Sequence, residues 1–348
     1  MFNKQKLAIG LDIGSYSVKV CEFQEVGEKC RLVKLGSAVL PDGAVEDGVL
    51  QDPDVVGGII SELINNLKIS VKNVAISISG YSVIVKKINL SVMEPDELAE
   101  YIMTEAEQYI PFDIDDVYLD FQDLHTGTKD SARTDVMLVA AKKEVVNAYL
   151  DMLAKIGLKT VVVDVDAFAL ENSYEKNFSL SDNVALIDIG ASKMSINIIS
   201  GGMSILARDV VLGSRQVTDQ IQSRFDLSFE EAEELKIGLV PAEDKKTELE
   251  GIFVNVCTQW ILEIKKALDF YFSSYPDESI SRLVLSGGGA KVKGLDKFLS
   301  DETGIPTEIF NPFTNIEVNT SNIDPQYIRQ IAPEMAISAG LATRPSSI

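Results

Sequence analysis

Short apolar runs alternate with polar turns along this chain, and one pattern of this kind occurs twice. Residues 7–20 read as an apolar strand, a small polar turn and a second strand with alternating apolar positions, and residues 184–198 repeat that order. Both copies contain Asp-Ile-Gly, at Asp12–Gly14 and Asp188–Gly190. The tripeptide alone is a weak match, but its shared context and half-chain spacing predict two related domains, each opening with a β-hairpin.

The first half contains more elements than one core sheet needs. Strands are predicted at 32–40, 73–79, 85–90, 117–125, 135–141 and 160–168, and helices at 53–68, 95–110 and 143–156. Pro111 ends the second of these helices and Gly157 the third. The extra strands and helices predict a small α+β module inserted at about 85–158.

The second half is more helical after its hairpin. Helices are predicted at 213–225, 228–237, 246–273, 294–301 and 333–343, and Ser228 with Glu231 forms a capping box. An apolar strand from residue 283 breaks into a glycine turn at Gly287–Gly289. The alternation of hairpins and helices predicts a two-domain α/β protein.

The expected domain bounds follow from this division of the chain. They are 1–84 for the first core, 85–158 for the inserted module, 159–180 for the return of the first domain, 181–210 for the second core, 211–280 for its helical subdomain, and 281–348 for the rest of the second core with a C-terminal connecting helix.

Composition and charge exclude several classes of protein. The 348 residues are 46% hydrophobic and 24% charged, which is typical of a folded globular chain. The net charge of −21 argues against nucleic acid and anionic lipid as partners. His125 is the single histidine, which excludes a multi-histidine metal site, and the three cysteines form no C-x-x-C pair. No apolar run approaches a membrane span, so we expect a cytoplasmic chain without direct membrane insertion.

The residues after each Asp-Ile-Gly are suited to phosphate. A tight glycine turn exposes backbone N–H groups, and Ser15, Ser17 and Ser192 add hydroxyl donors. Asp12 and Asp188, facing one another across a cleft, would hold hydrated Mg²⁺ together with phosphate oxygens. Either hairpin alone is more simply a structural turn, but the pair favours phosphate binding. The glycine turn at Gly287–Gly289 permits close approach of adenine or ribose, although by itself it is also an ordinary turn. Neither a Walker A loop nor a dinucleotide fingerprint occurs in the chain.

The ordered segments LDIGSYSVKV, VDVDAFAL, LIDIGASKMSI, AEELK, LSGGGAKVKGL and PEMAISAGLA resemble the actin/Hsp70/sugar-kinase ATPase superfamily over nearly the whole chain. The inserted module resembles that of the FtsA-like branch. Within this branch, EAEQYIPFDIDDV at 105–117 and DVDAFALEN are similar to the PilM family of type IV pilus assembly proteins. The resemblance implies a two-domain actin-like ATPase fold with an FtsA-like subdomain.

The resemblance also implies site residues and ligands. The expected ligands are ATP and Mg²⁺, the metal held by Asp12 and Asp188 through water. Asp166 lies where active relatives orient the attacking water, but the surrounding DAFAL differs from their pattern, so slow or absent ATPase activity is expected. The nucleotide site is implied at Asp12, Gly14, Ser15, Ser17, Lys19, Asp188, Gly190, Ala191, Ser192, Gly213, Glu233, Lys236, Gly287, Gly288 and Gly289.

Partners implied by the resemblance centre on the pilus machinery. The cytoplasmic N-terminal peptide of a PilN-like protein is expected to dock on the inserted module and to recruit the chain to the inner membrane. Through PilN the resemblance implies contact with PilO and PilP, and it further implies the pilus motor ATPases and self-association. The alternatives are a small-molecule kinase of the same superfamily and an FtsA-like filament-forming division protein.

Overall fold

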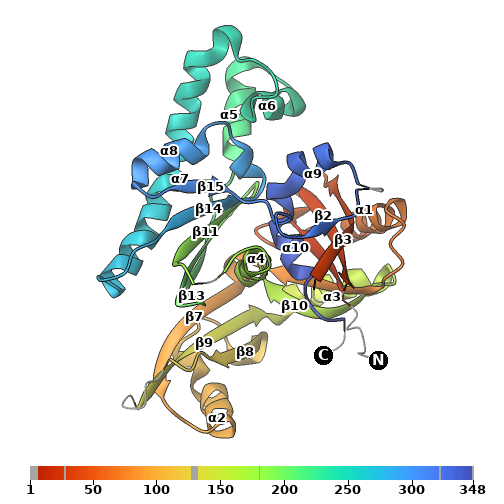
Figure 1. Ribbon diagram of the computed structural model, residues 1–348. Helices are drawn as coiled ribbons and strands as arrows, with labels where there is room; N and C mark the ends of the chain where they lie inside the picture. Colours follow the sequence, from red (N-terminus) through yellow and green to blue (C-terminus); the bar gives the residue numbers. More distant parts are fainter. Residues whose placement is uncertain (1–6, 27–28, 127–131, 180, 321–322, 347–348) are drawn as a thin grey trace.

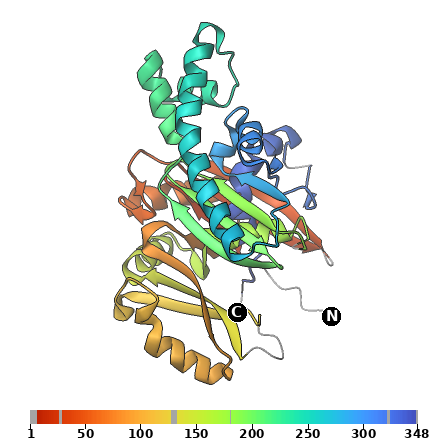
Figure 2. The ribbon, with the colours of Figure 1, turned by 90° about the vertical axis from the view of Figure 1, so that its left-hand side faces the viewer.

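The computed structural model describes residues 7–26, 29–126, 132–179, 181–320 and 323–346. They form two large β-sheets with helices between and around them, and a smaller sheet that projects from one end (Figure 1). The same three parts are visible after a quarter turn (Figure 2). Both predicted hairpins are present, and the mixed α/β class is confirmed.

The first sheet has six strands in the order β10-β6-β1-β2-β3-β16. These strands are β1 (Ile9–Ile13), β2 (Ser17–Val26), β3 (Lys29–Val39), β6 (Asn73–Ile78), β10 (Lys159–Val165) and β16 (Glu317–Val318). β1 pairs antiparallel with β2 and parallel with β6, so the first hairpin lies at the centre of the sheet. Ile9 and Leu11 pack under α1 (Pro53–Asn66) and α3 (Lys143–Lys155), whereas Ala8 lies in a separate cluster on the other face, as alternation along a strand requires.

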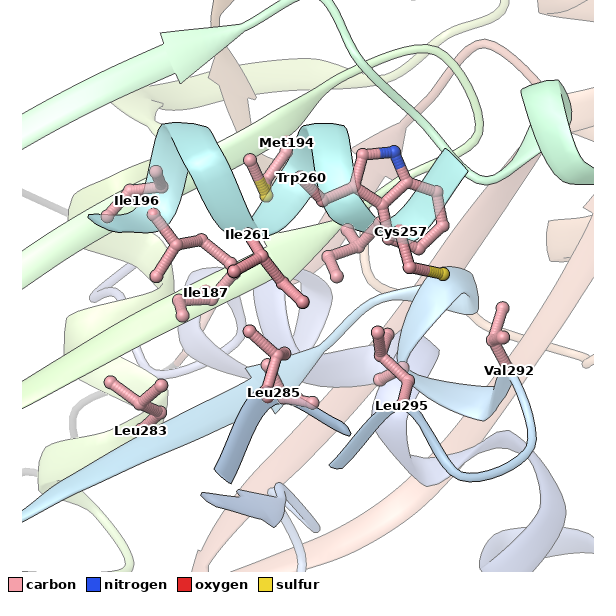
Figure 3. Close-up of a cluster of buried hydrophobic side chains, with 14 of the residues drawn as sticks. Ile187, Met194, Ile196, Cys257, Trp260, Ile261, Leu283, Leu285, Val292 and Leu295 are labelled. Carbon is pink, nitrogen blue, oxygen red and sulfur yellow. The ribbon is translucent and has the colours of Figure 1, made fainter. Parts of the chain in front are cut away.

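The second sheet has five strands in the order β13-β12-β11-β14-β15. They are β11 (Val184–Ile189), β12 (Met194–Ser200), β13 (Met203–Val210), β14 (Arg282–Ser286) and β15 (Thr307–Ile309). The long helix α7 (Lys246–Ser274) covers one face, where Trp260 and Ile261 lie against Ile187 and Leu285 (Figure 3). Burial of such side chains contributes about 1.5–3 kcal/mol each.

Two short helices, α4 (Asp166–Glu175) and α10 (Ala336–Leu341), cross between the large sheets (Figure 1). Leu170 and Tyr174 of α4 pack on the second sheet. Ala339 and Leu341 of α10 pack on the first. These helices therefore join the two halves at the level of the hairpin turns.

The projecting sheet is antiparallel, with the order β7-β9-β8, and carries one helix on its apolar face. Its elements are β7 (Val83–Ser91), β8 (Val117–Asp123), β9 (Arg133–Lys142) and α2 (Pro95–Glu105). Leu98 and Ile102 of α2 pack on Ile88 and Leu138, in a cluster separate from those of the large sheets. Beyond Glu105 the helix tightens into a 3₁₀ turn, so the predicted helix at 95–110 is α-helical only in its first part.

The remaining elements surround the second sheet and the edge of the first. They are α5 (Arg215–Phe225), α6 (Phe229–Lys236), α8 (Leu295–Thr303), α9 (Pro325–Ile331), and a ribbon of β4 (Val45–Glu46) and β5 (Val49–Leu50). The predicted capping box begins α6: the Glu231 N–H donates to Ser228 Oγ at 3.2 Å, and the Ser228 N–H donates to Glu231 Oε2 at 2.9 Å.

The packing differs from the expected domain bounds at two places. Helix α3 was expected in the module at 85–158, but its apolar face packs with α1 on the first sheet. Part of 281–348, expected in the second core, returns to the first sheet, where β16 pairs with β3 and Phe313 and Ile328 are buried. An amphipathic pattern identifies a buried face but not the surface that covers it. We therefore propose a module limited to β7–β9 with α2, and a first domain that includes the C-terminal segment.

The strand predicted at 160–168 is too long. β10 ends at Val165, and Asp166 begins α4. Asp166 therefore lies in the first turn of a helix, where a carboxylate interacts favourably with the helix dipole.

Across the described ranges, none of the helices combines the length and the apolar character needed to cross a bilayer.

Candidate functional site

The turns of the two large hairpins face one another across a cleft between the halves of the molecule. The hydroxyl oxygens of Ser15 and Ser192 are 2.9 Å apart, so the two turns meet. Most of the expected site residues line this cleft: Asp12, Gly14, Ser15, Ser17, Lys19, Asp166, Asp188, Gly190, Ala191, Ser192, Glu233, Lys236, Gly287 and Gly288.

Gly213 and Gly289 belong to the expected site but lie behind the cleft wall. A Cβ on Gly213 would lie 2.1 Å from the carbonyl oxygen of Ala191, in the second hairpin turn. A Cβ on Gly289 would lie 2.3 Å from Ile189 Cγ2. Gly213 needs to be glycine because the backbone of the second hairpin turn packs on it, and Gly289 because Ile189 does, so both residues shape the cleft from behind.

The two hairpin aspartates are buried and differ in their partners. Asp12 pairs with Lys19 at 3.2 Å. Burial nevertheless raises the pKa of Asp12, and the charge of Asp166 adds to this effect. Asp188 accepts a hydrogen bond from Ser286 Oγ at 2.8 Å. Burial, reinforced by the charges of Asp12 and Asp166, raises the pKa of Asp188 to about 6.

Asp166 is held by a lysine that the sequence analysis did not assign to the site. Lys193 Nζ lies 2.5 Å from Asp166 Oδ2 and also donates to the hydroxyl of Ser79. Burial opposes ionisation of Asp166, but the charge of Lys193 and its hydrogen bond lower the pKa of Asp166. The carboxylate is therefore ionised and already engaged, which leaves it poorly placed to orient a water molecule.

Glu233 and Lys236 form the wall next to the glycine turn. Lys236 Nζ lies 2.5 Å from Glu233 Oε1 and 3.0 Å from Thr218 Oγ1. Burial lowers the pKa of Lys236 although Glu233 opposes that shift. A buried pair with a hydroxyl partner is a rigid set of donors and acceptors, which suits the hydroxyl groups of a ribose.

Several contacts across the cleft mouth were not predicted. Tyr16 of the first hairpin packs on Phe229 of α6, with ring centroids 5.5 Å apart. Arg215 of α5 pairs with Asp42 at 2.5 Å. The sequence could have indicated Lys193, because it is the first charged residue after the second Asp-Ile-Gly. The two pairs across the cleft mouth could not be predicted, because their members lie far apart in the sequence.

Within the part of the chain that the structure describes, no three His, Cys, Asp or Glu side chains gather into a metal site. Asp12 and Asp188 both line the cleft, and the charge of Asp12 raises the pKa of Asp188. Two buried carboxylates fit Mg²⁺, which takes its other ligands from phosphate and water.

Two α/β halves joined by crossing helices, with hairpin turns facing across a cleft, define an actin-like ATPase fold. The family model described as type IV pilus assembly protein PilM matches residues 10–346. The chain therefore belongs to the PilM family of type IV pilus assembly proteins.

Solved structures agree with this assignment. The chain is 28% identical to a chain of a PilM–PilN type IV pilus biogenesis complex, covering 97% of this chain and 98% of that one, with a TM-score of 0.86. The ethanolamine utilization protein EutJ from Carboxydothermus hydrogenoformans is 15% identical (96% and 88% covered, TM-score 0.57). MreB5 of Spiroplasma citri bound to ADP is 13% identical (94% and 99% covered, TM-score 0.51). The last two show the shared fold alone.

Proposed function

We propose that this pilus assembly protein binds ATP with Mg²⁺ in the cleft and docks a segment of a PilN-like protein. The observation that carries the nucleotide proposal is the meeting of the two Asp-Ile-Gly turns, with Ser15 and Ser192 in contact. Further support comes from the MreB5 structure of similar fold, which was determined with ADP.

Each wall of the cleft has a distinct role in this proposal. Backbone N–H groups and hydroxyls of the hairpin turns bind the phosphates, and Lys19 neutralises part of their charge. Asp12 and Asp188 hold the metal through water, which screens the triphosphate charge. Glu233 and Lys236 contact the ribose, and the turn at Gly287–Gly288 accommodates the adenosine, because it presents backbone without side chains.

The nucleotide is expected to stabilise the protein without being consumed rapidly. A ligand that binds only the folded state adds about 2.7 kcal/mol at a concentration of 100 Kd. In the nucleotide-free protein Lys193 engages Asp166, and the residues around that carboxylate, DAFAL, differ from the pattern of active relatives, so slow turnover is expected. We expect Mg²⁺-ATP to raise the melting temperature while kcat stays below about 1 s⁻¹. Differential scanning fluorimetry and a phosphate-release assay measure the two quantities, and faster turnover would favour the kinase alternative.

The partner proposal concerns the junction between the projecting sheet and the first domain. Tyr118 of β8 donates to Asn147 of α3 at 3.0 Å, and Lys143 of α3 donates to the carbonyl of Asp115 at 2.7 Å. Tyr118 remains 47% exposed, which leaves an aromatic surface beside acidic residues. We propose that an extended segment of a PilN-like protein binds here. The similarity to a chain of a PilM–PilN complex supports this proposal.

The wider assembly follows from the same proposal. A chain bound to PilN would be held at the inner membrane by that partner. PilO and PilP would be reached through PilN, and the pilus motor ATPases and further copies of this chain would be additional partners.

Replacing Tyr118 tests the docking site without removing any element. We expect Tyr118→Ser to weaken binding of a synthetic PilN N-terminal peptide at least about tenfold in calorimetric titration, because an aromatic anchor is lost. Tyr327→Ser on α9 is the matched control, since Tyr327 is 39% exposed on another part of the surface. Equal affinities for Tyr118→Ser and the unmodified protein would remove this junction as the docking site.

A further inference from the structure

Lys193 is fixed in position relative to the second hairpin turn. The Gly190 N–H donates to the Lys193 carbonyl at 2.8 Å, so the lysine backbone closes the turn. Its side chain lines the cleft, is 22% exposed and lies among Asp166, Ser79 and Asp209, the last at 4.0 Å. The Lys193 ammonium group, at the base of the second hairpin turn, is thus surrounded by these protein side chains while the two turns are in contact.

One of these partners, Ser79, lies on the segment that leads into the projecting sheet. Ser79 follows β6, and the next residue, Gly80, donates its N–H to Asp209 Oδ2 at 2.7 Å. β7 begins at Val83, three residues later. A second contact connects the same strand to the other half, since Lys87 donates to the Tyr275 hydroxyl at 2.6 Å.

We propose that Lys193 distinguishes a nucleoside triphosphate from a diphosphate by exchanging Asp166 and Ser79 for the terminal phosphate. The inference rests on the proposed nucleotide function. A terminal phosphate carries more negative charge than a single aspartate, and a charge-assisted hydrogen bond to it is stronger than one to a serine hydroxyl. A diphosphate lacks that group, so Lys193 keeps its contacts with Asp166 and Ser79.

The exchange has a consequence outside the cleft. When Lys193 turns to the phosphate, Ser79 loses its charged donor, while the hydrogen bond from the Gly80 N–H to Asp209 and the packing of the Asp47–Gly48 backbone remain. The start of β7 is then less restrained. The identity of the nucleotide is thereby transmitted to the sheet on which we place the partner peptide.

The test compares the affinities for Mg²⁺-ATP and Mg²⁺-ADP in calorimetric titration. We expect Lys193→Met to lower the ATP affinity at least about tenfold and the ADP affinity less than about threefold. Lys291→Met removes the same charge at the other end of the cleft, where Lys291 pairs with Glu334 at 2.6 Å, and should lower both affinities alike. Since Lys193→Met leaves Asp166 buried without its cation, the double variant Lys193→Met/Asp166→Asn repeats the measurement in a protein without that unpaired charge.

Hydrogen exchange of the Gly80 amide is the second readout. In the unmodified protein we expect faster exchange with ATP than with ADP, and in Lys193→Met no difference between the two. The inference is overturned if both Lys193 variants keep the ratio of ATP to ADP affinity of the unmodified protein. It is also overturned if the Gly80 amide of the unmodified protein exchanges equally fast with the two nucleotides. Neither result contradicts nucleotide binding itself. Failure of the unmodified protein to bind either nucleotide overturns both.

Discussion

Asp188→Asn is expected to stabilise the nucleotide-free protein and to abolish measurable binding of Mg²⁺-ATP. Asp188 is buried and accepts a hydrogen bond from the Ser286 hydroxyl at 2.8 Å. The ionised carboxylate lowers the stability of the folded protein, because none of the Lys and Arg side chains that the structure describes forms an ion pair with it. An asparagine removes the charge and keeps an oxygen that accepts from Ser286, but it cannot balance the charge of a hydrated Mg²⁺.

The sign of the pH dependence follows from the raised pKa. In the folded protein the pKa of Asp188 is about 6, above its ordinary value of 3.8. Between these values the folded state binds more protons than the unfolded state, so this group lowers the free energy of unfolding as pH rises from about 4 to about 6. At pH 7 the ionised Asp188 therefore lowers the free energy of unfolding by about 3 kcal/mol. Asp188→Asn removes this contribution, and its advantage over the unmodified protein should vanish near pH 4.

Thermal unfolding at pH 4.5 and 7.5, together with calorimetric titration with Mg²⁺-ATP, tests this prediction. Asp135→Asn in the projecting sheet is the control of opposite sign: burial opposes its ionisation, but hydrogen bonds from Asn89 and Lys87 lower its pKa. That variant should be less stable at pH 7.5 and should bind ATP normally. A destabilised Asp188→Asn, or one that retains ATP affinity, would contradict the assigned role of Asp188.

Asp12→Ala should also weaken Mg²⁺-ATP binding, because Asp188 alone cannot hold the metal.

Among the glycines that the structure describes, Gly340 is expected to show the largest loss of stability when it is replaced by alanine. A Cβ on Gly340 would lie 1.7 Å from the carbonyl oxygen of Ala169 and 2.6 Å from its carbonyl carbon. That contact joins α10 to α4, and both helices are packed against the large sheets, so neither can shift without opening a core. We expect a loss of about 3 kcal/mol or more, the upper range for overpacking.

Gly58→Ala is the matched control for Gly340→Ala. Gly58 lies within α1, and an added Cβ there has no atom within 4 Å. Alanine is the better helix former, so a gain of about 0.5–1 kcal/mol is expected. Urea unfolding followed by circular dichroism and by the fluorescence of Trp260, the single tryptophan, gives both values. If the two variants unfold at the same urea concentration, α4 and α10 do not pack as closely at Gly340 as the structure shows.

Local features of the chain were read correctly from the residues. Alternating apolar positions around Asp12–Gly14 and Asp188–Gly190 predicted both hairpins, because strand alternation is a property of consecutive residues. The capping box at Ser228 likewise depends on residues three apart. The order of these motifs along the chain sufficed for the resemblance to the family that the comparisons then confirmed. The roles of the individual cleft residues stay predictions.

Contacts between distant segments could not be read in the same way. The apolar face of α3 is evident in the sequence, but its packing on α1 rather than on the projecting sheet depends on how the chain returns through β10. The pairs Lys193–Asp166 and Ser286–Asp188 join residues far apart in sequence, and neither member signals its partner. Burial, which sets the pKa of Asp188, exists only after both sheets have assembled, because it is the exclusion of water by residues from many segments.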